Sequence, residues 1–468
     1  MVRLVDMVID WRMGPSAFCG DIRQFYNSIL LSEEHWQYQK VLLKKDLDPQ
    51  SKILIGVIRT LIYGVKSVGN QCEEVIKLLA EIIWDKFPEV AKLLIFKSYV
   101  DDFGKSTTGK DETKELIEKT TYVLKMIHMV IKGWAESGQD PPADISEDGV
   151  SIGFAGMTWF PKGDFYKLNI QSLHFSKKKR GKFPSDLVKF EDTKDVSVEQ
   201  FTPKDITRTN CTSVTARIYD TQGLLAPLTL KLKNDLRTLI SYEPSWTKTI
   251  PDHQRAIWVN NFKTIEEVRD ILYLRCSIPS DALSCQARIL LLCDAANPGI
   301  ILGGYTCYER PNDEWSCDLL FGKGLLAQEN WTIPQKELHG MSALSNLKVV
   351  LENCLDSWIQ EFFSFGDSEI ALSWIIYEKV KLTTFIRNRV INIRTKMGLD
   401  ILHHVEGKNN PTDVGTRPEE ISAESVKPGS VWLKGKPWMN MSMEKAKESG
   451  IIKHVDEIKL TNDKLTEK

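Results

Sequence analysis

The chain has 468 residues, of which 42% are hydrophobic and 26% are charged, and its formal net charge is −2 at pH 7. This composition is typical of a folded protein of roughly two to four domains and excludes a disordered chain. No run of about 18 apolar residues occurs, which excludes a membrane-spanning helix. The start, MVRLVDMVIDWRMG, lacks the apolar core and cleavage site of a secretory signal, so we expect an intracellular protein, cytoplasmic or nuclear.

The nine cysteines contain no CxxC pair, and none of the eight histidines falls at ligand spacing beside them. A zinc site is therefore not expected. Several cysteines lie in apolar runs, so we interpret the set as buried, reduced thiols.

The first acidic cluster follows a strand-like run. Residues 93–100 predict a strand that ends in Asp101 and Asp102, and residues 16–21 predict another that ends in Asp21. Adjacent carboxylates repel each other unless a cation holds them, and a third acid from a neighbouring strand would complete a site that Mg²⁺ favours. The alternative is a polar hairpin turn, in which Asp serves only local hydrogen bonds.

A second set of acids follows the elements of a mixed sheet. Five strands are predicted, at residues 289–293, 303–308, 315–321, 362–366 and 401–405. With the helical segments between them, the order is β, β, β, α, β, α, α, β. Four acids fall at strand ends, in a first helical turn or in the last loop: Asp294, Glu337, Asp367 and Asp413. All four can converge on one sheet edge and would then need divalent cations, although each alone is commonly a cap or turn residue.

The first cluster resembles a known polymerase signature. Tyr99-Val-Asp-Asp102 resembles the YxDD motif of reverse transcriptases, and residues 21–26, DIRQFY, resemble the strand motif with their other metal-binding aspartate. Residues 63–69 are similar to the segment that shapes the nucleotide pocket. The resemblance implies these site residues: catalytic and metal-binding Asp21, Asp101 and Asp102, and nucleotide-binding Tyr26, Gly64 and Ser67.

The second cluster matches the Asp–Glu–Asp–Asp order of ribonucleases H, which implies catalytic and metal-binding roles for all four of its acids. Further strings resemble BEL/Pao-type LTR retrotransposons, at residues 219–227, 333–338, 366–374, 385–390 and 410–417. We therefore expect a fragment of a retroelement Pol polyprotein. The protease and integrase segments of such a polyprotein are expected partners, but their signatures are absent from this sequence.

The resemblance implies an α+β, multidomain fold. Residues 1–175 would form a reverse transcriptase palm, a ferredoxin-like sheet with helices and truncated fingers. Residues 176–285 would form a helical thumb- or connection-like region. Residues 286–420 would form a ribonuclease H-like mixed sheet with helices, and residues 421–468 a tail or linker towards a missing integrase.

The implied function is RNA-directed DNA polymerase joined to ribonuclease H, with two Mg²⁺ ions per active site or Mn²⁺ in their place. The implied partners are an RNA template, a DNA primer, their RNA–DNA hybrid and dNTPs. A basic run is expected to bind nucleic-acid phosphates, and it consists of Lys177, Lys178, Lys179, Arg180 and Lys182. The alternative is that this run is only a solvated loop. Because most of the fingers subdomain is missing, we predict a weak or inactive polymerase half and a more nearly self-contained ribonuclease H half.

Two alternatives stay open. The chain could be a non-catalytic nucleic-acid-binding scaffold, which the retained acids disfavour, or a decayed and inactive retrotransposon copy, which the sequence does not exclude. His403 and His404 precede Asp413 closely enough for a catalytic histidine, and the alternative is that both belong to a strand.

Overall fold

The computed structural model describes residues 4–46, 48, 50–175, 188–377 and 382–458. The chain folds into two compact units, residues 1–155 with 160–164, and residues 156–159 with 165–468. The predicted four-part division stays a prediction, and the basic run at 177–182 lies outside the described residues. Within the described ranges, the helices are all too short or too polar to cross a membrane.

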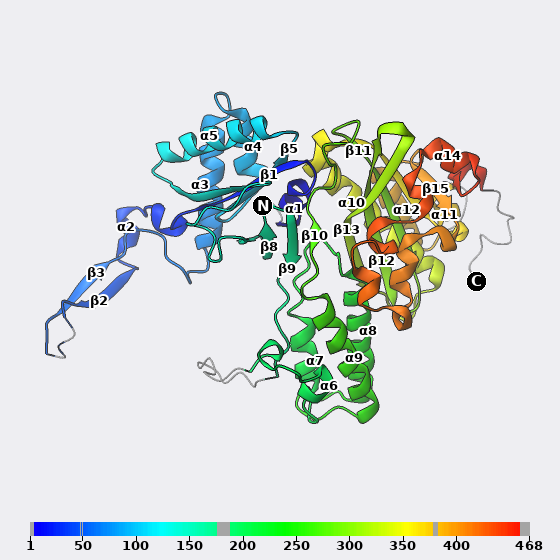
Figure 1. Ribbon diagram of the computed structural model, residues 1–468, viewed down its shortest axis with the longest axis horizontal. Coiled ribbons are helices and arrows are strands. Elements are labelled where there is room, and N and C mark those ends of the chain that lie inside the picture. Colours follow the sequence, from blue (N-terminus) through cyan, green and yellow to red (C-terminus); the bar gives the residue numbers. More distant parts are fainter. Residues whose placement is uncertain (1–3, 47, 49, 176–187, 378–381, 459–468) are drawn as a thin grey trace. The chain divides into compact units, whose positions relative to one another are not determined.

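The first unit is built on a four-stranded sheet with the order β4-β5-β1-β6. The strands of the first unit, within this sheet and outside it, are β1 (Ser16–Ile22), β2 (Lys40–Lys44), β3 (Ile53–Val57), β4 (Ser98–Tyr99), β5 (Asp102–Thr107), β6 (Ile131–Glu136) and β7 (Ile152–Phe154). Its helices are α1 (Leu4–Trp11), α2 (Glu33–Trp36), α3 (Val68–Ile83), α4 (Pro88–Phe96) and α5 (Lys110–Met126). Apolar side chains of α3, α4 and α5 pack with those of β1 and β5 into one core. These helices therefore cover one face of the sheet (Figure 1).

The predicted strand over residues 93–100 is wrong for most of its length, because α4 continues to Phe96 and only Ser98 and Tyr99 form β4. A short apolar run does not distinguish a buried helix from a buried strand. Pro88 in the first turn of α4 is the helix-start signal that favours the helix. The hairpin turn is as predicted, since Tyr99 pairs with Asp102.

The second unit begins with small elements and continues into helices. The strands are β8 (Met157–Phe160), β9 (Phe165–Leu168) and β10 (Tyr273–Leu274), and the helices are α6 (Val198–Phe201), α7 (Arg208–Thr215), α8 (Ala226–Tyr242) and α9 (Asp252–Val268). α8 and α9 run side by side (Figure 1), joined by Lys231, whose ammonium contacts Asp235 and Asn261 at 2.7 and 2.6 Å.

A six-stranded mixed sheet forms the larger part of this unit, with the order β13-β12-β11-β14-β15-β16. The strands are β11 (Ala287–Ala295), β12 (Gly299–Arg310), β13 (Glu314–Leu326), β14 (Ile359–Gly366), β15 (Leu402–Val405) and β16 (Ile452–His454). The helices are α10 (Ile333–Leu355), α11 (Glu369–Ile376), α12 (Thr384–Lys396), α13 (Val431–Lys434) and α14 (Met443–Glu448). The order from β11 to β15 is the predicted β, β, β, α, β, α, α, β.

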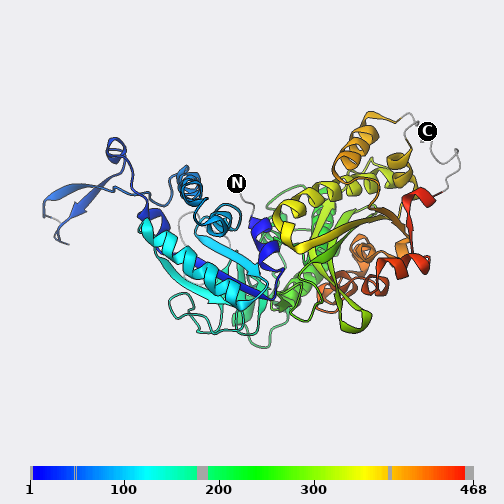
Figure 2. The same ribbon diagram turned by 90° about the horizontal axis from the view of Figure 1, so that it is seen from above.

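Two neighbouring residues of β12 show how the sheet is covered. A Cβ on Gly340 of α10 would lie 3.1 Å from Ile300, and a Cβ on Gly415 would lie 2.4 Å from Ile301. Successive side chains of a strand point to opposite faces. α10 therefore covers one face of the sheet (Figure 2), and the 3₁₀ helix at Pro411–Thr416 covers the other.

The structure differs from the expected tail or linker after residue 420. β16 adds a strand to the sheet, and Trp432 and Trp438 are buried. Trp432 donates its indole N–H to the Leu224 carbonyl at 2.9 Å, so the last described segment is tied to the start of α8. Aromatic anchors, rather than the local Lys and Glu content, decide the packing here.

The interpretation of all cysteines as buried thiols is wrong. Cys307 and Cys317 face each other across β12 and β13 and form a disulfide. Their Cα atoms are 4.3 Å apart, the close spacing of directly paired residues on antiparallel strands. Cys285 is exposed as well.

Candidate active site

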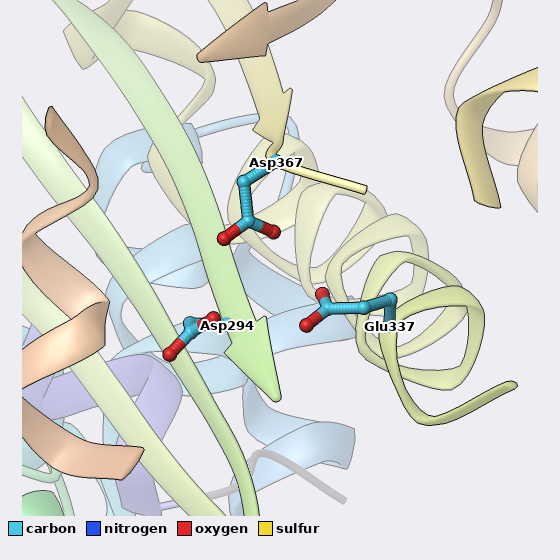
Figure 3. A group of neighbouring side chains, drawn as sticks. All are labelled: Asp294, Glu337 and Asp367. Carbon is cyan, nitrogen blue, oxygen red and sulfur yellow. The ribbon is translucent and has the colours of Figure 1, made fainter. Parts of the chain in front are cut away.

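Three acids from three elements face one another at one end of the mixed sheet (Figure 3). Asp294 is the next-to-last residue of β11, Glu337 lies in α10, and Asp367 directly follows β14. One carboxylate oxygen from each lies within 4.8 Å of the others. Across the part of the chain that the structure describes, this is the one group of three possible metal ligands at such spacing. We call it the acidic triad.

The parallel pairing of two strands explains why Asp294 and Asp367 meet. β11 and β14 are parallel neighbours, and Leu292 is paired with Phe365. Each acid follows its paired residue by two positions, so both carboxylates lie at the same edge of the sheet. The carboxyl ends of parallel strands are the usual position for sites in sheets of this kind.

Close packing of a helix against the sheet brings the third acid in. Gly340 lets α10 approach β11, because a Cβ at this position would lie 3.1 Å from the Cys293 sulfur. One helical turn earlier, Glu337 accepts a hydrogen bond from the Ala295 N–H at 2.8 Å. The Glu337 carboxylate is therefore fixed to the end of the strand that carries Asp294.

Burial and mutual repulsion perturb the acidic triad. Burial, followed by the charges of Asp367 and Asp294, raises the pKa of Glu337 well above its usual range. Burial and then Asp294 raise the pKa of Asp367 to about 7. Burial also raises the pKa of Asp294, and a hydrogen bond from Thr416 opposes it. The group therefore favours a positive charge among its oxygens.

Two buried oxygens of the acidic triad have no hydrogen-bond partner, Glu337 Oε2 and Asp367 Oδ1. Buried acceptors are normally satisfied, so orphaned ones require an explanation. Converging carboxylate oxygens are the ligands that Mg²⁺ and Mn²⁺ prefer. The residues present therefore fit a hard divalent cation.

The segment 410–417 positions Asp294 from the opposite side. Asn410 is fully buried and donates its amide to the Cys293 carbonyl at 2.8 Å, while its own Oδ1 accepts from Thr412. Thr416, 5% exposed, donates its hydroxyl to Asp294 Oδ2. These contacts hold the end of β11 and its carboxylate in one orientation.

Asp413, the fourth predicted acid, does not belong to the compact group of three. Its charge nevertheless raises the pKa of both Asp294 and Asp367, so it lies within electrostatic reach. Its carboxylate is paired with Arg417, with Nη2 2.7 Å from Oδ2, and Nε and Nη2 3.2 and 3.0 Å from Oδ1. The fourth acid is thus neutralised by the chain itself.

Both candidate histidines lie on β15. His403 is 1% exposed and packs between aromatic rings, and burial lowers its pKa to about 4. The imidazole Nε2 of His404 lies 3.2 Å from the Asp367 carbonyl oxygen. His403 is a core residue, and His404 contacts the backbone of the acidic triad rather than a carboxylate.

In the first unit, Asp21 of β1 lies opposite Asp102 of β5 in the strand register. Both line a cavity of about 140 Å³, together with Lys132, whose Nζ is 4.0 Å from Asp21 Oδ2. Burial and then Asp101 raise the pKa of Asp21, and Lys132 opposes this. Burial and then Asp101 raise the pKa of Asp102 to about 7. The three aspartates are neighbours but do not form a group as compact as the acidic triad.

The turn that carries Asp101 is strained. Val100 has φ 57°, a left-handed conformation that β-branched residues rarely adopt. Behind the turn, Gly104 allows the Phe154 ring to pack, because a Cβ would lie 2.1 Å from it. The Ile22 N–H donates to the Asp101 carbonyl at 3.2 Å, which ties the turn to β1. Backbone strain of this kind clusters at functional sites.

The predicted nucleotide-binding residues lie around this turn. The rings of Tyr26 and Tyr63 are 4.5 Å apart. Burial and then nearby groups, among them Cys72 and Asp101, raise the pKa of Tyr26, so the phenol lies within electrostatic reach of Asp101. Gly64 has φ +91°, and nothing lies within 4 Å of the position that a Cβ would take there; Ser67 precedes α3 as its N-cap residue.

Sequence reasoning missed three side chains beside the acids. Thr416 and Asn410 lie inside the string at 410–417, but neutral residues carry no charge pattern that would single them out. Lys132 faces Asp21 only because β6 pairs with β1, where Gly133 is opposite Asp21. A strand pairing between segments this distant is not readable from local periodicity.

The family comparison assigns a ribonuclease H-like domain to part of the second unit. Residues 207–368 match the family described as Pao retrotransposon-like RNaseH-like domain, a range that begins at α7 and ends just after β14. The resemblance of this chain to BEL/Pao-type retroelement polyproteins is confirmed by that match. No curated protein matches the chain.

Two solved structures are similar in their overall trace. One is the foamy viral protease-reverse transcriptase in complex with an RNA/DNA hybrid, with 12% identity and a TM-score of 0.48 over 83% of this chain and 44% of that one. The other is the foamy viral protease-reverse transcriptase dRH in complex with double-stranded DNA, with 12% identity and a TM-score of 0.47 over 87% of this chain and 59% of that one. This chain therefore spans about half the length of these proteins.

Proposed function

We propose that the second unit is a divalent-metal-dependent ribonuclease H that cuts the RNA strand of an RNA–DNA hybrid. The observation that carries the proposal is the approach of Asp294, Glu337 and Asp367 to within 4.8 Å at one sheet edge. Buried carboxylates at this spacing, two of them with orphaned oxygens, are costly unless a cation joins them. The family match supports the same chemistry.

The residues of the site would have different roles. The acidic triad would hold the divalent ions, with Asp413 as a further ligand. Divalent ions held by these residues would supply the positive charge that activates an attacking water and stabilises a leaving oxygen. Thr416 orients Asp294, and the Ala295 N–H orients Glu337. Recognition of the hybrid would depend on its shape and on the 2′-hydroxyl groups of its RNA strand.

The test is cleavage of an RNA–DNA hybrid by the full chain, with Mg²⁺ or Mn²⁺ added and with EDTA. We expect cleavage that requires the metal and falls at least about 1000-fold in Asp294→Asn and Asp367→Asn. Glu352→Gln is the matched control, since Glu352 lies on α10 with a side chain 44% exposed. Metal-independent cleavage, or full cleavage by either aspartate variant, would contradict the proposal.

We infer, second, that the first unit is the palm of an RNA-directed DNA polymerase with low residual activity. The register that places Asp21 opposite Asp102, beside the strained Asp101 turn, supports this inference. These aspartates would bind Mg²⁺ and the phosphates of a dNTP, and Tyr26 would contact its sugar. RNA template and DNA primer would be the macromolecular substrates.

Extension of a DNA primer on an RNA template tests this second inference. We expect slow extension that is lost in Asp101→Asn and kept in Asp111→Asn, an exposed acid in the first turn of α5. Extension that does not depend on Asp101 would remove the polymerase assignment. Rapid extension by the unaltered chain would contradict the low activity.

A further inference from the structure

Arg417 holds the one predicted acid that stands apart from the acidic triad. Its guanidinium makes a forked contact with Asp413, with three N–O distances between 2.7 and 3.2 Å. The same guanidinium lies 3.9 Å from Glu420. Forked Arg–carboxylate pairs are directional and stronger than single contacts. In the free protein, the Asp413 carboxylate is therefore already paired with Arg417.

This pair borders the acidic triad. Arg417 is four residues after Asp413, and its immediate neighbour Thr416 donates a hydrogen bond to Asp294. The charge of Asp294 contributes to a raised pKa of Arg417, and Asp413 contributes to the raised pKa of Asp294. Both Arg417 and Asp413 are therefore close enough to interact electrostatically with a cation bound by the acidic triad.

The backbone around the pair is fixed, whereas the pair itself is accessible. Asn410 and Thr412 are fully buried, and Gly415 is packed against Ile301. The side chains of Arg417 and Asp413 are 52% and 27% exposed. Side chains that reach solvent in this way change rotamer without disturbing the fold. Asp413 can therefore exchange its partner while its Cα stays in place.

We propose that Arg417 is a positioning residue that controls when Asp413 joins the acidic triad. In the free protein Arg417 neutralises Asp413. When a nucleic-acid phosphate binds, the Arg417 guanidinium pairs with the phosphate instead of with Asp413. The Asp413 carboxylate is then free to bind a divalent ion. This inference rests on the proposed ribonuclease H function and makes the ion at Asp413 dependent on bound substrate.

The exchange follows from the chemistry of the groups. A guanidinium fork fits a phosphate as well as it fits a carboxylate. The guanidinium contacts both oxygens of the Asp413 carboxylate, so a hard cation that binds there competes with Arg417 for the same lone pairs and is repelled by its charge. With substrate bound, a phosphate replaces Asp413 as the partner of Arg417. The ion can then bind Asp413 without leaving Arg417 unpaired.

Binding of Mn²⁺ to the full chain, measured by calorimetry, tests the proposal without any activity readout. The probe for substrate is a hybrid of 2′-O-methyl RNA and DNA, which is not cut. The wild-type protein should bind one ion strongly without the hybrid and a second only with it. Arg417→Gln should bind the second ion without the hybrid, at least about ten-fold more tightly than the wild type.

Two further variants sharpen the result. Arg417→Lys keeps the charge but loses the fork, so its second Mn²⁺ affinity should lie between those of the wild type and Arg417→Gln. Lys434→Gln is the matched control, because Lys434 pairs with Asp318 at side-chain exposures of 48% and 27% and lies on a different segment. It should bind Mn²⁺ as the wild type does.

The outcomes separate this inference from the proposed function. If Arg417→Gln leaves the number and affinity of Mn²⁺ sites unchanged, or if the wild type binds two ions equally well without the hybrid, the role of Arg417 is refuted and the ribonuclease H proposal stands. If the wild type binds no Mn²⁺, or if Asp294→Asn leaves the first site intact, the proposed function fails and this inference fails with it.

Discussion

Replacement of Glu337 by glutamine should stabilise the metal-free protein while it removes metal binding. Glu337 is 4% exposed, has one orphaned carboxylate oxygen and is repelled by Asp367 and Asp294. A glutamine keeps an acceptor for the Ala295 N–H and offers its amide to the neighbouring carboxylates. The variant therefore loses a repulsion and gains a donor.

The magnitude follows from the shifted acids. One pKa unit corresponds to about 1.4 kcal/mol, so the rise of Asp367 from 3.8 to about 7 represents about 4 kcal/mol for an isolated group. Burial and Asp294 are the main causes of that rise, so it sets only the scale of the energies at this site. The charges of Asp367 and Asp294 act on Glu337 in the same way, and removal of that repulsion should return part of this amount, about 2 kcal/mol. For a unit of this size, that corresponds to a rise in Tm of about 3 °C.

The pH dependence has a definite sign. The folded-state pKa of each triad acid is raised, so its favourable contribution is present below the unfolded pKa and is lost as pH rises through the folded value. Without metal, the wild type should be less stable at pH 8 than at pH 5. The advantage of Glu337→Gln should grow over the same interval.

Thermal unfolding at pH 5 and pH 8, with EDTA or with Mg²⁺, measures both effects. Mg²⁺ should raise the Tm of the wild type at pH 8 and leave that of Glu337→Gln nearly unchanged. Glu352→Gln, on the exposed side of the same helix, should behave as the wild type. A Glu337→Gln protein that is less stable than the wild type at pH 8 in EDTA would refute the reasoning.

Three other predictions follow from single contacts. Thr416→Val removes the hydroxyl that holds Asp294 and should weaken Mn²⁺ binding about ten-fold in calorimetry, whereas Thr416→Ser should not. Gly223→Ala should lower the free energy of unfolding by more than about 3 kcal/mol in urea titrations, because φ is +77° and its Cβ would lie 1.7 Å from the Gly322 carbonyl oxygen; a variant with unchanged stability would contradict this packing. His403 has its pKa lowered to about 4, so its contribution is full above its unfolded pKa of about 6.5 and is lost as pH falls towards 4; urea titrations should show that His403→Phe removes about 3 kcal/mol of that acid sensitivity, and an unchanged pH profile would exclude this role.

The sequence predicts the mixed sheet well because its elements are long and periodic. The leucines and methionine of α10 repeat at helical spacing, and the strands from β11 to β15 are bounded by turn residues or acids. The failure at residues 93–96 has a physical reason, since four consecutive apolar residues fit a buried helix and a buried strand equally. Tertiary packing, here against α3, decides between them.

The candidate site is only partly accessible to sequence reasoning. Strand ends bring Asp294 and Asp367 together, which the order of elements already indicates. Three contacts depend on side-chain geometry that sequence spacing does not reveal. They are the Arg417–Asp413 ion pair, the hydrogen bond from Thr416 to Asp294 and the approach of Lys132 to Asp21. The resemblance supplied the identities of the acids, and the fold supplied the residues that orient them.

The central claim is that Asp294, Glu337 and Asp367 share a divalent ion, and a crystal of this chain soaked in Mn²⁺ tests it most directly. Anomalous scattering should give a peak within bonding distance of all three carboxylates, and Asp294→Asn should remove it. Mn²⁺ peaks confined to exposed acids elsewhere, with none among these three side chains, would contradict the claim.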